Sequence, residues 1–225
     1  MIPVIGIRPG MTVGGFRIVQ RIGVGGMGEV WLAYQEALDR HVALKLLSPV
    51  LTHDPAFVDQ FRDEVRLAAR LEHPHIITAY DAGEDQGIHY FATSFVEGEE
   101  LADRLRREGP LPERDALRIA RQVADALRYA WKRFRILHRD VKPDNIMVTP
   151  DGDAMLMDLG ISKSVADDSG RAVEPEILGT PEFMSPEQVR GDENMDARAD
   201  MYSLGATLYE LLTGTPPFRK DSDIA

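Results

Sequence analysis

The chain of 225 residues contains no cysteine, which excludes disulfide bonds and thiolate metal sites and suits a reducing compartment. It also lacks a long apolar run, because the longest stretch, 204–212, is too short to cross a bilayer and contains Glu210. Residues 1–4 form no basic leader, so we expect no signal peptide. Positively charged residues are outnumbered as well, with 26 Lys and Arg against 37 Asp and Glu. The net charge of −11 argues against nucleic acid or an anionic membrane as a partner.

The densest group of chemically active side chains lies at 138–145, which reads His-Arg-Asp-Val-Lys-Pro-Asp-Asn, and Asp158 follows thirteen residues after Asn145. Together Asp140, Lys142, Asn145 and Asp158 provide a proton acceptor, a cation and hard oxygen ligands. Phosphoryl transfer from a magnesium-bound nucleotide needs these three kinds of group. We therefore expect the catalytic residues of the chain to lie in this stretch.

A glycine-rich turn lies between two strand-like runs, 16–21 and 29–34; it consists of Ile22, Gly23, Val24, Gly25, Gly26, Met27 and Gly28. Glycines let backbone N–H groups approach phosphate oxygens without a Cβ in the way. The same spacing also occurs in dinucleotide-binding folds, where the turn opens a helix. Here β-prone residues follow, and another strand candidate comes at 41–47. Strand, turn and strand favour a flap over phosphates.

The strand candidate at 41–47 carries Lys45 among apolar neighbours. The next segment, 55–71, has apolar residues at helical spacing with Glu64 beside the stripe. A Lys–Glu pair about 4 Å apart gains roughly 4 kcal/mol at an effective dielectric near 20, but desolvation offsets much of this. We therefore interpret Glu64 as a residue that holds Lys45 against phosphates.

Taken in order, these motifs resemble those of a protein kinase, and most of all those of the bacterial, eukaryotic-like serine/threonine kinases. The matching stretches include 185–187, which reads Ser-Pro-Glu, and 200–205, which reads Asp-Met-Tyr-Ser-Leu-Gly. The resemblance implies an α+β, bilobal fold with an antiparallel β N-lobe and a helical C-lobe. It also implies that ATP and Mg²⁺ are the cofactors.

The resemblance assigns roles to individual residues. Asp140 would accept the proton of the substrate hydroxyl, and Lys142 would neutralise the γ-phosphate. Asn145 and Asp158 would hold magnesium. Lys142 and Thr180 match the serine/threonine branch of the family, so protein Ser and Thr side chains are the expected acceptors.

Adenine binding is placed by the same resemblance. The run 89–98 looks like the last N-lobe strand and the hinge, with Thr93 as gatekeeper. The Ser94 carbonyl and the Val96 N–H would bond the adenine edge, with Val30 and Ala43 above the ring and Met147 below it. Such apolar residues are commonly core, and the family often has an acidic residue in place of Ser94.

The expected domains are an N-terminal extension at 1–14, an N-lobe at 15–96 and a C-lobe at 97–225. The family's C-lobe continues beyond the residue matched by Ala225, so the C-lobe is expected to be incomplete and a fragment of a longer kinase is favoured over a natural truncation. We expect protein substrates, self-association for autophosphorylation, and no nucleic-acid or membrane contact from this segment. The expected location is the cytoplasm, either free or as the cytoplasmic domain of a membrane-anchored kinase.

Two alternatives stay open at this stage. A pseudokinase or scaffold that binds nucleotide without turnover is one, although it would tend to have lost Lys45, Asp140, Asn145 and Asp158. His73 and His75 could form a metal pair, although the turn after the helix at 55–71 is the favoured interpretation.

Overall fold

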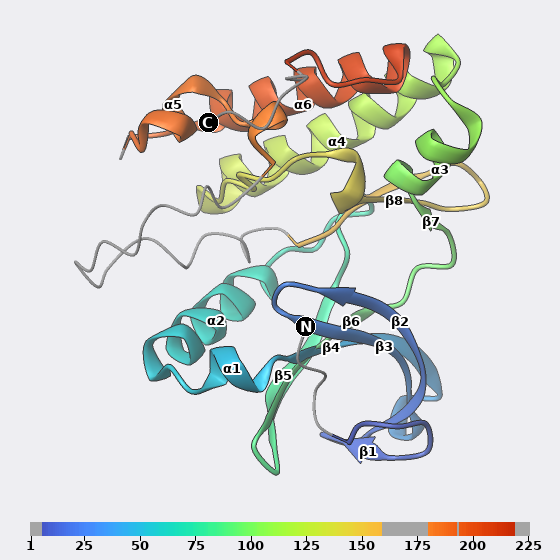
Figure 1. Ribbon diagram of the computed structural model, residues 1–225, viewed down its shortest axis with the longest axis vertical. Helices are drawn as coiled ribbons and strands as arrows, with labels where there is room; N and C mark the ends of the chain where they lie inside the picture. Colours follow the sequence, from blue (N-terminus) through green and yellow to red (C-terminus); the bar gives the residue numbers. More distant parts are fainter. Residues whose placement is uncertain (1–5, 159–179, 193, 219–225) are drawn as a thin grey trace. The chain divides into compact units, whose positions relative to one another are not determined.

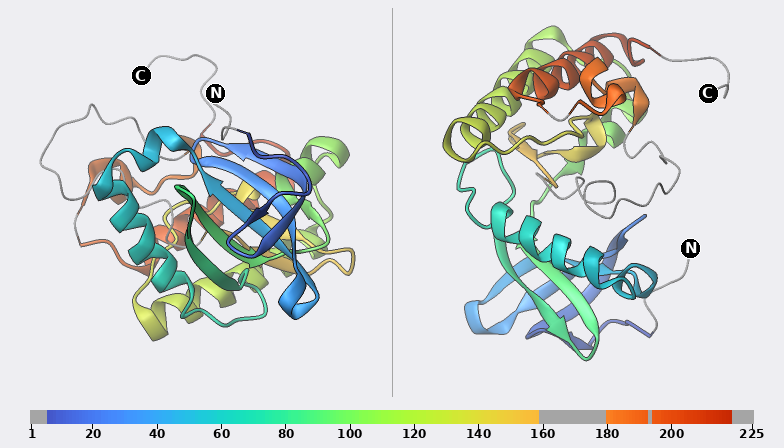
Figure 2. Two further views of the ribbon diagram at one scale, coloured as in Figure 1. Left: turned by 90° about the horizontal axis from the view of Figure 1, so that it is seen from below. Right: turned by 90° about the vertical axis from the view of Figure 1, so that its left-hand side faces the viewer.

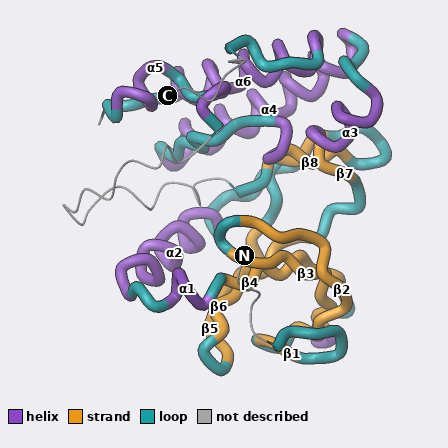
Figure 3. Tube along the Cα trace, viewed as in Figure 1, coloured by secondary structure: helices purple, strands orange, loops and turns teal. Residues whose placement is uncertain are grey.

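The computed structural model describes residues 6–158, 180–192 and 194–218, apart from the side chains of residues 60 and 64. The chain divides into two compact units. Unit 1 comprises Met1–Glu72 and Thr78–Phe95, and unit 2 comprises His73–Ile77 and Val96–Ala225. Most strands belong to unit 1 and most helices to unit 2, as Figure 3 shows, so the predicted α+β class is confirmed. None of the helices in the described residues is long and apolar enough to cross a membrane.

Unit 1 is built on a six-stranded antiparallel sheet in the order β1-β2-β3-β4-β6-β5 (Figure 1). The strands are β1 Thr12–Val13, β2 Phe16–Gly25, β3 Gly28–Gln35, β4 Arg40–Leu47, β5 Ala79–Asp85 and β6 Ile88–Ser94. A short 3-10 turn, Glu36–Leu38, joins β3 to β4. The three strands predicted at 16–21, 29–34 and 41–47 are all present, and β2 continues four residues further.

Alternation along β4 gives the sheet two different faces. Val42, Leu44 and Leu46 are fully buried in the core of unit 1, together with Phe16 and Ile18. The residues between them project from the opposite face, because successive strand side chains point to opposite sides. One face of the sheet therefore packs into the hydrophobic core of unit 1. The opposite face carries residues that do not belong to this core.

Two helices follow β4, α1 Pro49–Thr52 and α2 Pro55–Ala68. The Asp54 side chain caps α2 by accepting a hydrogen bond from the Ala56 N–H at 2.9 Å. Phe61 of α2 packs edge-on against Phe91 of β6, with ring centroids 6.3 Å apart. The helix predicted over 55–71 is present, and it ends at Ala68, three residues before the predicted end.

Unit 2 combines a three-stranded sheet with helices. The sheet has the order β7 Glu99–Glu100, β8 Ile146–Val148 and β9 Ala154–Leu156, and the helices are α3 Leu101–Glu108, α4 Glu113–Phe134, α5 Pro186–Arg190 and α6 Ala197–Thr213. The long helices α4 and α6 lie side by side (Figures 1 and 2). Short 3-10 turns at Pro143–Asn145 and Pro181–Phe183 complete the unit.

Helix α6 contains the stretch 200–205, one of the matching motifs. It begins at Ala197 with Asp196 as its N-cap, three residues before Asp200. It is also buried on one side only: Leu204 and Leu211 are buried, whereas Met201 and Tyr209 are about half exposed. The sequence has apolar residues around the whole helix, and packing against α4 covers one face of it.

Candidate active site

The β2–β3 hairpin holds the predicted glycine-rich turn, with Gly25 paired to Gly28. Gly28 has a positive φ of 149°, and a Cβ there would lie 2.0 Å from the Leu46 carbonyl oxygen. This position therefore requires glycine for steric reasons. At Gly25 or Gly26 a Cβ would meet no atom of the described residues within 4 Å. Steric crowding by the described residues therefore does not explain why Gly25 and Gly26 are glycines.

Strand register gathers several of the predicted nucleotide residues on one face of the unit 1 sheet. Val30 pairs with Lys45 across β3 and β4, and Ala43 pairs with Thr93 across β4 and β6. Directly paired residues project from the same face. All four side chains are half-buried. The Thr93 hydroxyl also donates to the Ala43 carbonyl at 3.5 Å, a long hydrogen bond.

The predicted partners Lys45 and Glu64 lie on two elements of unit 1, β4 and α2. Lys45 pairs in register with Phe91, whose ring packs on Phe61 of α2. Glu64 follows Phe61 by three residues on that helix. The side chain of Glu64 lies outside the described part of the structure, so the ion pair stays a prediction.

The predicted hinge residues are divided between the units. Ser94 ends β6, where its N–H donates to the Thr78 carbonyl at 2.8 Å and its hydroxyl accepts from the Thr78 N–H at 3.1 Å. Val96 and Met147 belong to unit 2, with Met147 on β8 opposite Met155. The adenine contacts of Ser94, Val96 and Met147 stay predictions.

In unit 2 a single polar network joins the predicted catalytic residues. Asp140 Oδ2 lies 2.9 Å from Lys142 Nζ and accepts a hydrogen bond from Asn145 Nδ2 at 2.8 Å. Lys142 Nζ also donates to Thr180 Oγ1 at 2.9 Å. The Asp140 and Lys142 side chains are only 17% and 16% exposed. Four of the predicted residues are therefore linked by successive contacts in a partly desolvated environment.

Asp200 holds the backbone of the loop that carries this network. Its two carboxylate oxygens accept hydrogen bonds from the His138 N–H at 2.9 Å and the Arg139 N–H at 2.8 Å. Arg139 has a positive φ of 66°, which is rare for a residue with a side chain and costs of the order of 1–3 kcal/mol. The charge-assisted bonds from Asp200, which is 3% exposed, offset that cost.

The His138 ring links the same loop to the end of β9. Nε2–H donates to the Met157 carbonyl at 2.8 Å, and Nδ1 accepts from the Asp140 N–H at 3.2 Å. The Met157 N–H in turn donates to the Asn145 carbonyl at 2.9 Å. These bonds place exposed Asp158, with a positive φ of 50°, two positions after the last residue of β9. Residues 159 and 160 of the same motif lie outside the described part.

Sequence reasoning missed the supporting role of Asp200 and of Gln188. Gln188 Nε2 donates to the Arg139 carbonyl at 2.7 Å and completes a capping box with Ser185 at the start of α5. The spacing Ser-x-x-Gln is a recognised signal for such a box, so the cap could have been found. Its contact with residue 139, forty-nine positions away, could not.

Acidic groups around Asp144 influence one another. Burial raises the pKa of the Glu100 carboxyl, and the charges of Asp103 and Asp144 add to the effect. Burial also raises the pKa of Glu210, with smaller contributions from Asp144 and Glu182.

The histidine pair is engaged in local structure. His73 Nε2 lies 3.3 Å from Asp125 Oδ2, and His75 Nδ1 lies 2.9 Å from the Ala154 carbonyl oxygen. Across the described residues, no group of three or more His, Cys, Asp or Glu side chains could hold a metal ion. The turn interpretation of His73 and His75 is thus favoured.

Residues 16–225 match the family model described as protein kinase domain. The chain belongs to the protein kinase family. It is 42% identical over 208 residues to the serine/threonine-protein kinase PknB of Mycobacterium leprae, which covers 91% of this chain and 33% of that protein. It is also 43% identical over 219 residues to PknF of Mycobacterium tuberculosis, covering 95% of this chain and 46% of that protein. The chain therefore spans a third to a half of the length of these relatives.

Solved structures agree with the sequence comparison. The kinase domain of Mycobacterium tuberculosis PknI matches with a TM-score of 0.78 and 34% identity, over 96% of this chain and 80% of that one. The antiparallel sheet of unit 1 and the helices of unit 2 follow the bilobal kinase fold. Both the predicted family and the predicted fold are confirmed.

Proposed function

We propose that this chain is the catalytic part of a serine/threonine protein kinase, which transfers the γ-phosphate of ATP to Ser and Thr hydroxyls of proteins. The observation that carries the proposal is the contact network of Asp140, Lys142, Asn145 and Thr180. The names of the PknB relatives support the same acceptor class.

Asp140 is proposed as the group that orients and deprotonates the acceptor hydroxyl. Lys142 and Asn145 both engage Oδ2, which fixes the carboxylate plane. Oδ1 meets no hydrogen-bond donor among the described residues, so it is available to a substrate hydroxyl. Lys142 stands between Asp140 and Thr180, where its ammonium group would neutralise a transferring phosphate.

Asn145 and Asp158 fit the role of magnesium ligands. Asn145 uses its amide nitrogen on Asp140, which leaves its amide oxygen for a cation. Magnesium in kinases is held by one or two protein groups together with substrate phosphates, so a two-residue set is sufficient. When bound, the ion would neutralise charge that develops on the phosphate oxygens.

The nucleotide is proposed to bind unit 1 along its second sheet face. Gly25 and Gly26 allow backbone N–H groups to reach phosphates, and Lys45, held by Glu64, would contact the α- and β-phosphates. The adenine would be enclosed and hydrogen-bonded by Val30, Ala43, Thr93, Ser94, Val96 and Met147. We also propose a cytoplasmic location, either free or as part of a membrane-anchored kinase, and self-association for autophosphorylation.

The test is the turnover of the full-length protein on a Ser/Thr peptide, followed by mass spectrometry. Asp140→Asn and Lys45→Met should each lower kcat by about a hundredfold or more, since each removes a charge that acts on the reacting groups. Asp151→Asn, an exposed turn position, is the matched control and should leave kcat unchanged. Retention of more than about a tenth of wild-type kcat by Asp140→Asn would remove this residue from the mechanism.

The same experiment addresses the pseudokinase alternative. A protein that binds ATP, seen as a rise in its melting temperature, but yields no phosphopeptide would favour that alternative. The presence of Lys45, Asp140, Asn145 and Asp158 argues for turnover.

A further inference from the structure

Helix α4 carries a basic stripe in an otherwise acidic chain. Residues 113–135 contain seven Lys or Arg and three Asp or Glu, although the net charge of the whole chain is −11. Six of the seven basic residues recur at intervals of three, four or seven positions, which places five of them on one face of α4, with the sixth, Arg135, at its C-cap. They are Arg114, Arg118, Arg121, Arg128, Lys132 and Arg135, and we call this set the basic stripe.

The basic stripe faces away from the core of unit 2. Ile119, Val123 and Leu127, on the opposite side of α4, are buried. This buried side contacts α6 and β9. The side chains of the stripe are exposed, apart from half-buried Arg118. The side of α4 that carries charge is thus available to a partner, and the apolar side is not.

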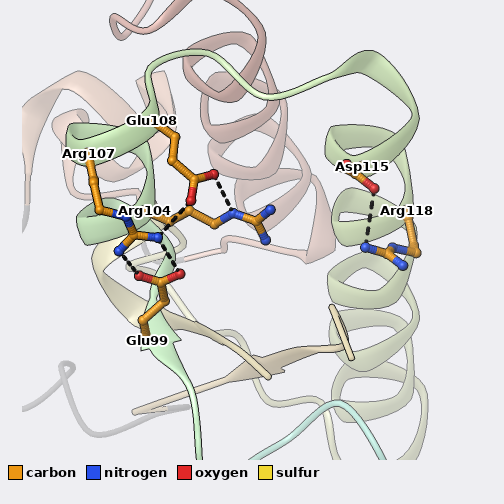
Figure 4. Close-up of polar contacts among 6 residues, drawn as sticks. All are labelled: Glu99, Arg104, Arg107, Glu108, Asp115 and Arg118. Carbon is orange, nitrogen blue, oxygen red and sulfur yellow. Dashed lines mark hydrogen bonds and ion pairs between the residues drawn. The ribbon is translucent and has the colours of Figure 1, made fainter. Parts of the chain in front are cut away.

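The arginines of α3 all form ion pairs with neighbouring acidic residues, unlike those of α4. On α3, Arg104 pairs with Glu108, Arg106 with Asp103, and Arg107 with Glu99 and Glu108; Figure 4 shows the contacts of Arg104 and Arg107. These arginines are neutralised within their own surroundings.

On α4 only part of the stripe is neutralised. Arg118 pairs with Asp115 at 3.2 Å, as Figure 4 shows, and Arg128 pairs with Asp125. Arg114, Arg121 and Lys132 form no ion pair with any described residue. A hollow of about 590 Å³ at the start of the helix is lined by Arg114, Asp115, Arg118 and Arg121, together with Pro112 and Leu117. Two of its three arginines, Arg114 and Arg121, have no acidic partner in the described part of the chain.

We propose that the basic stripe is a docking surface for an acidic segment of a protein substrate, an inference that rests on the proposed function. The stripe is one residue wide and extends about 30 Å at 1.5 Å per residue, which fits a polypeptide. Guanidinium groups bind carboxylates in a bidentate manner, and five of the six residues are arginine.

The position of the stripe favours a substrate over other partners. It ends at Arg135, three residues before His138, so a segment bound along it comes within about 11 Å of the catalytic loop. A membrane or a duplex nucleic acid is an extended anion that would also face the acidic remainder of the chain, whereas a short acidic segment meets the stripe alone. Peripheral membrane helices also need a row of exposed apolar side chains, whereas the large apolar side chains of α4 are mostly buried and Leu117 is an isolated exposed one.

Direct binding is measured by fluorescence anisotropy with a labelled 20-residue peptide that has Glu at every third or fourth position and Ala elsewhere. The docking variant combines Arg114→Gln, Arg121→Gln and Lys132→Gln, which removes exposed charges without breaking an internal ion pair. It should bind the peptide about tenfold more weakly, because exposed charge pairs contribute modestly and three are lost. Raising the salt concentration should weaken wild-type binding in the same direction.

The matched control removes the same total charge elsewhere. Arg17→Gln, Arg62→Gln and Arg106→Gln combined affect exposed arginines that pair with Glu36, Asp59 and Asp103. This variant should bind the Glu peptide within about twofold of wild type, since screened charges at a distance have little effect. A Gln version of the peptide should bind neither protein.

Kinetics on the full-length protein separate docking from catalysis. The Glu segment is fused to a Ser/Thr acceptor peptide, and the acceptor alone serves for comparison. The docking variant should raise KM for the fused peptide about tenfold, with kcat and the kinetics on the acceptor alone unchanged. If neither the wild type nor any variant phosphorylates either peptide, the proposed function is wrong. The anisotropy measurement then still shows whether the basic stripe binds the Glu peptide.

Unchanged binding of the Glu peptide by the docking variant would overturn the proposal. Vesicles containing phosphatidylserine and duplex DNA serve as competitors. Tighter binding of either one, lost in the docking variant, would assign the stripe to that class of partner and overturn the proposal as well.

Discussion

At the scale of the residue, Asp200 shows how a buried charge organises a catalytic loop. A carboxylate that is 3% exposed is costly unless its oxygens are hydrogen-bonded, and both oxygens of Asp200 accept backbone N–H groups. Those N–H groups belong to His138 and Arg139, immediately before Asp140. The position of the proposed base therefore depends on a side chain of α6.

Replacing Asp200 by Asn should lower both stability and activity. The amide retains one acceptor, so one charge-assisted bond is lost and a buried N–H is left without a partner, at a cost of about 1.5–3 kcal/mol. Urea unfolding measures the stability, and kcat should fall because the loop before Asp140 is released. Asp196→Asn, at the partly exposed N-cap of the same helix, is the control and should have a smaller effect. Unaltered stability and turnover in Asp200→Asn would contradict this role.

At the scale of the element, the β2–β3 hairpin contains glycines of two kinds. Gly28 is enclosed by the backbone of β4, whereas Gly25 and Gly26 have open space around them in the described structure. The first kind serves the fold, and the second kind matches the proposed approach of phosphates. The glycine-rich turn thus contains one glycine that the fold requires and two that the proposed binding of phosphates requires.

These two kinds of glycine can be separated by substitution with alanine. Gly28→Ala should destabilise unit 1 by about 2 kcal/mol or more, because the new Cβ would overlap the Leu46 carbonyl oxygen and φ is unfavourable. Gly26→Ala should change the unfolding free energy by less than about 0.5 kcal/mol and yet raise KM for ATP. Denaturant titrations and ATP kinetics test both variants. Equal stability of the two would show that the contact at Leu46 can relax.

At the scale of the whole molecule, the two units present different surfaces. The outer side of α6 in unit 2 exposes Met201, Tyr209 and Leu212, and Phe218 beside it is 65% exposed. A hollow of about 310 Å³ lies among Met201, Tyr209, Phe218 and neighbouring residues. Contiguous apolar surface of this kind promotes association in water.

We expect the isolated 225-residue chain to self-associate through this apolar surface. Size-exclusion chromatography with light scattering at several concentrations should show an apparent mass that rises with concentration. Met201→Gln combined with Phe218→Ser should reduce the rise. Leu38→Ser, which removes an exposed apolar side chain of unit 1, should not. A wild-type chain that stays monomeric throughout would refute the expectation.

The sequence by itself determined much of the local structure and identified the candidate catalytic residues. The apolar patterns predicted β3 and β4 to within one residue at each end, because the period of apolar residues follows directly from strand geometry. The stretch 138–145 was identified for a similar reason. Its reactive residues are close in sequence, so a single turn and loop bring them together.

Only the tertiary structure decided which distant residues meet. Lys142 and Thr180 are thirty-eight positions apart, and His138 and Asp200 sixty-two, so no local pattern relates them. The packing of α6 against α4 also decided which face of α6 is covered, although its apolar residues lie on all sides. Such contacts depend on the packing of whole elements, which brings together side chains whose separation along the chain carries no signal.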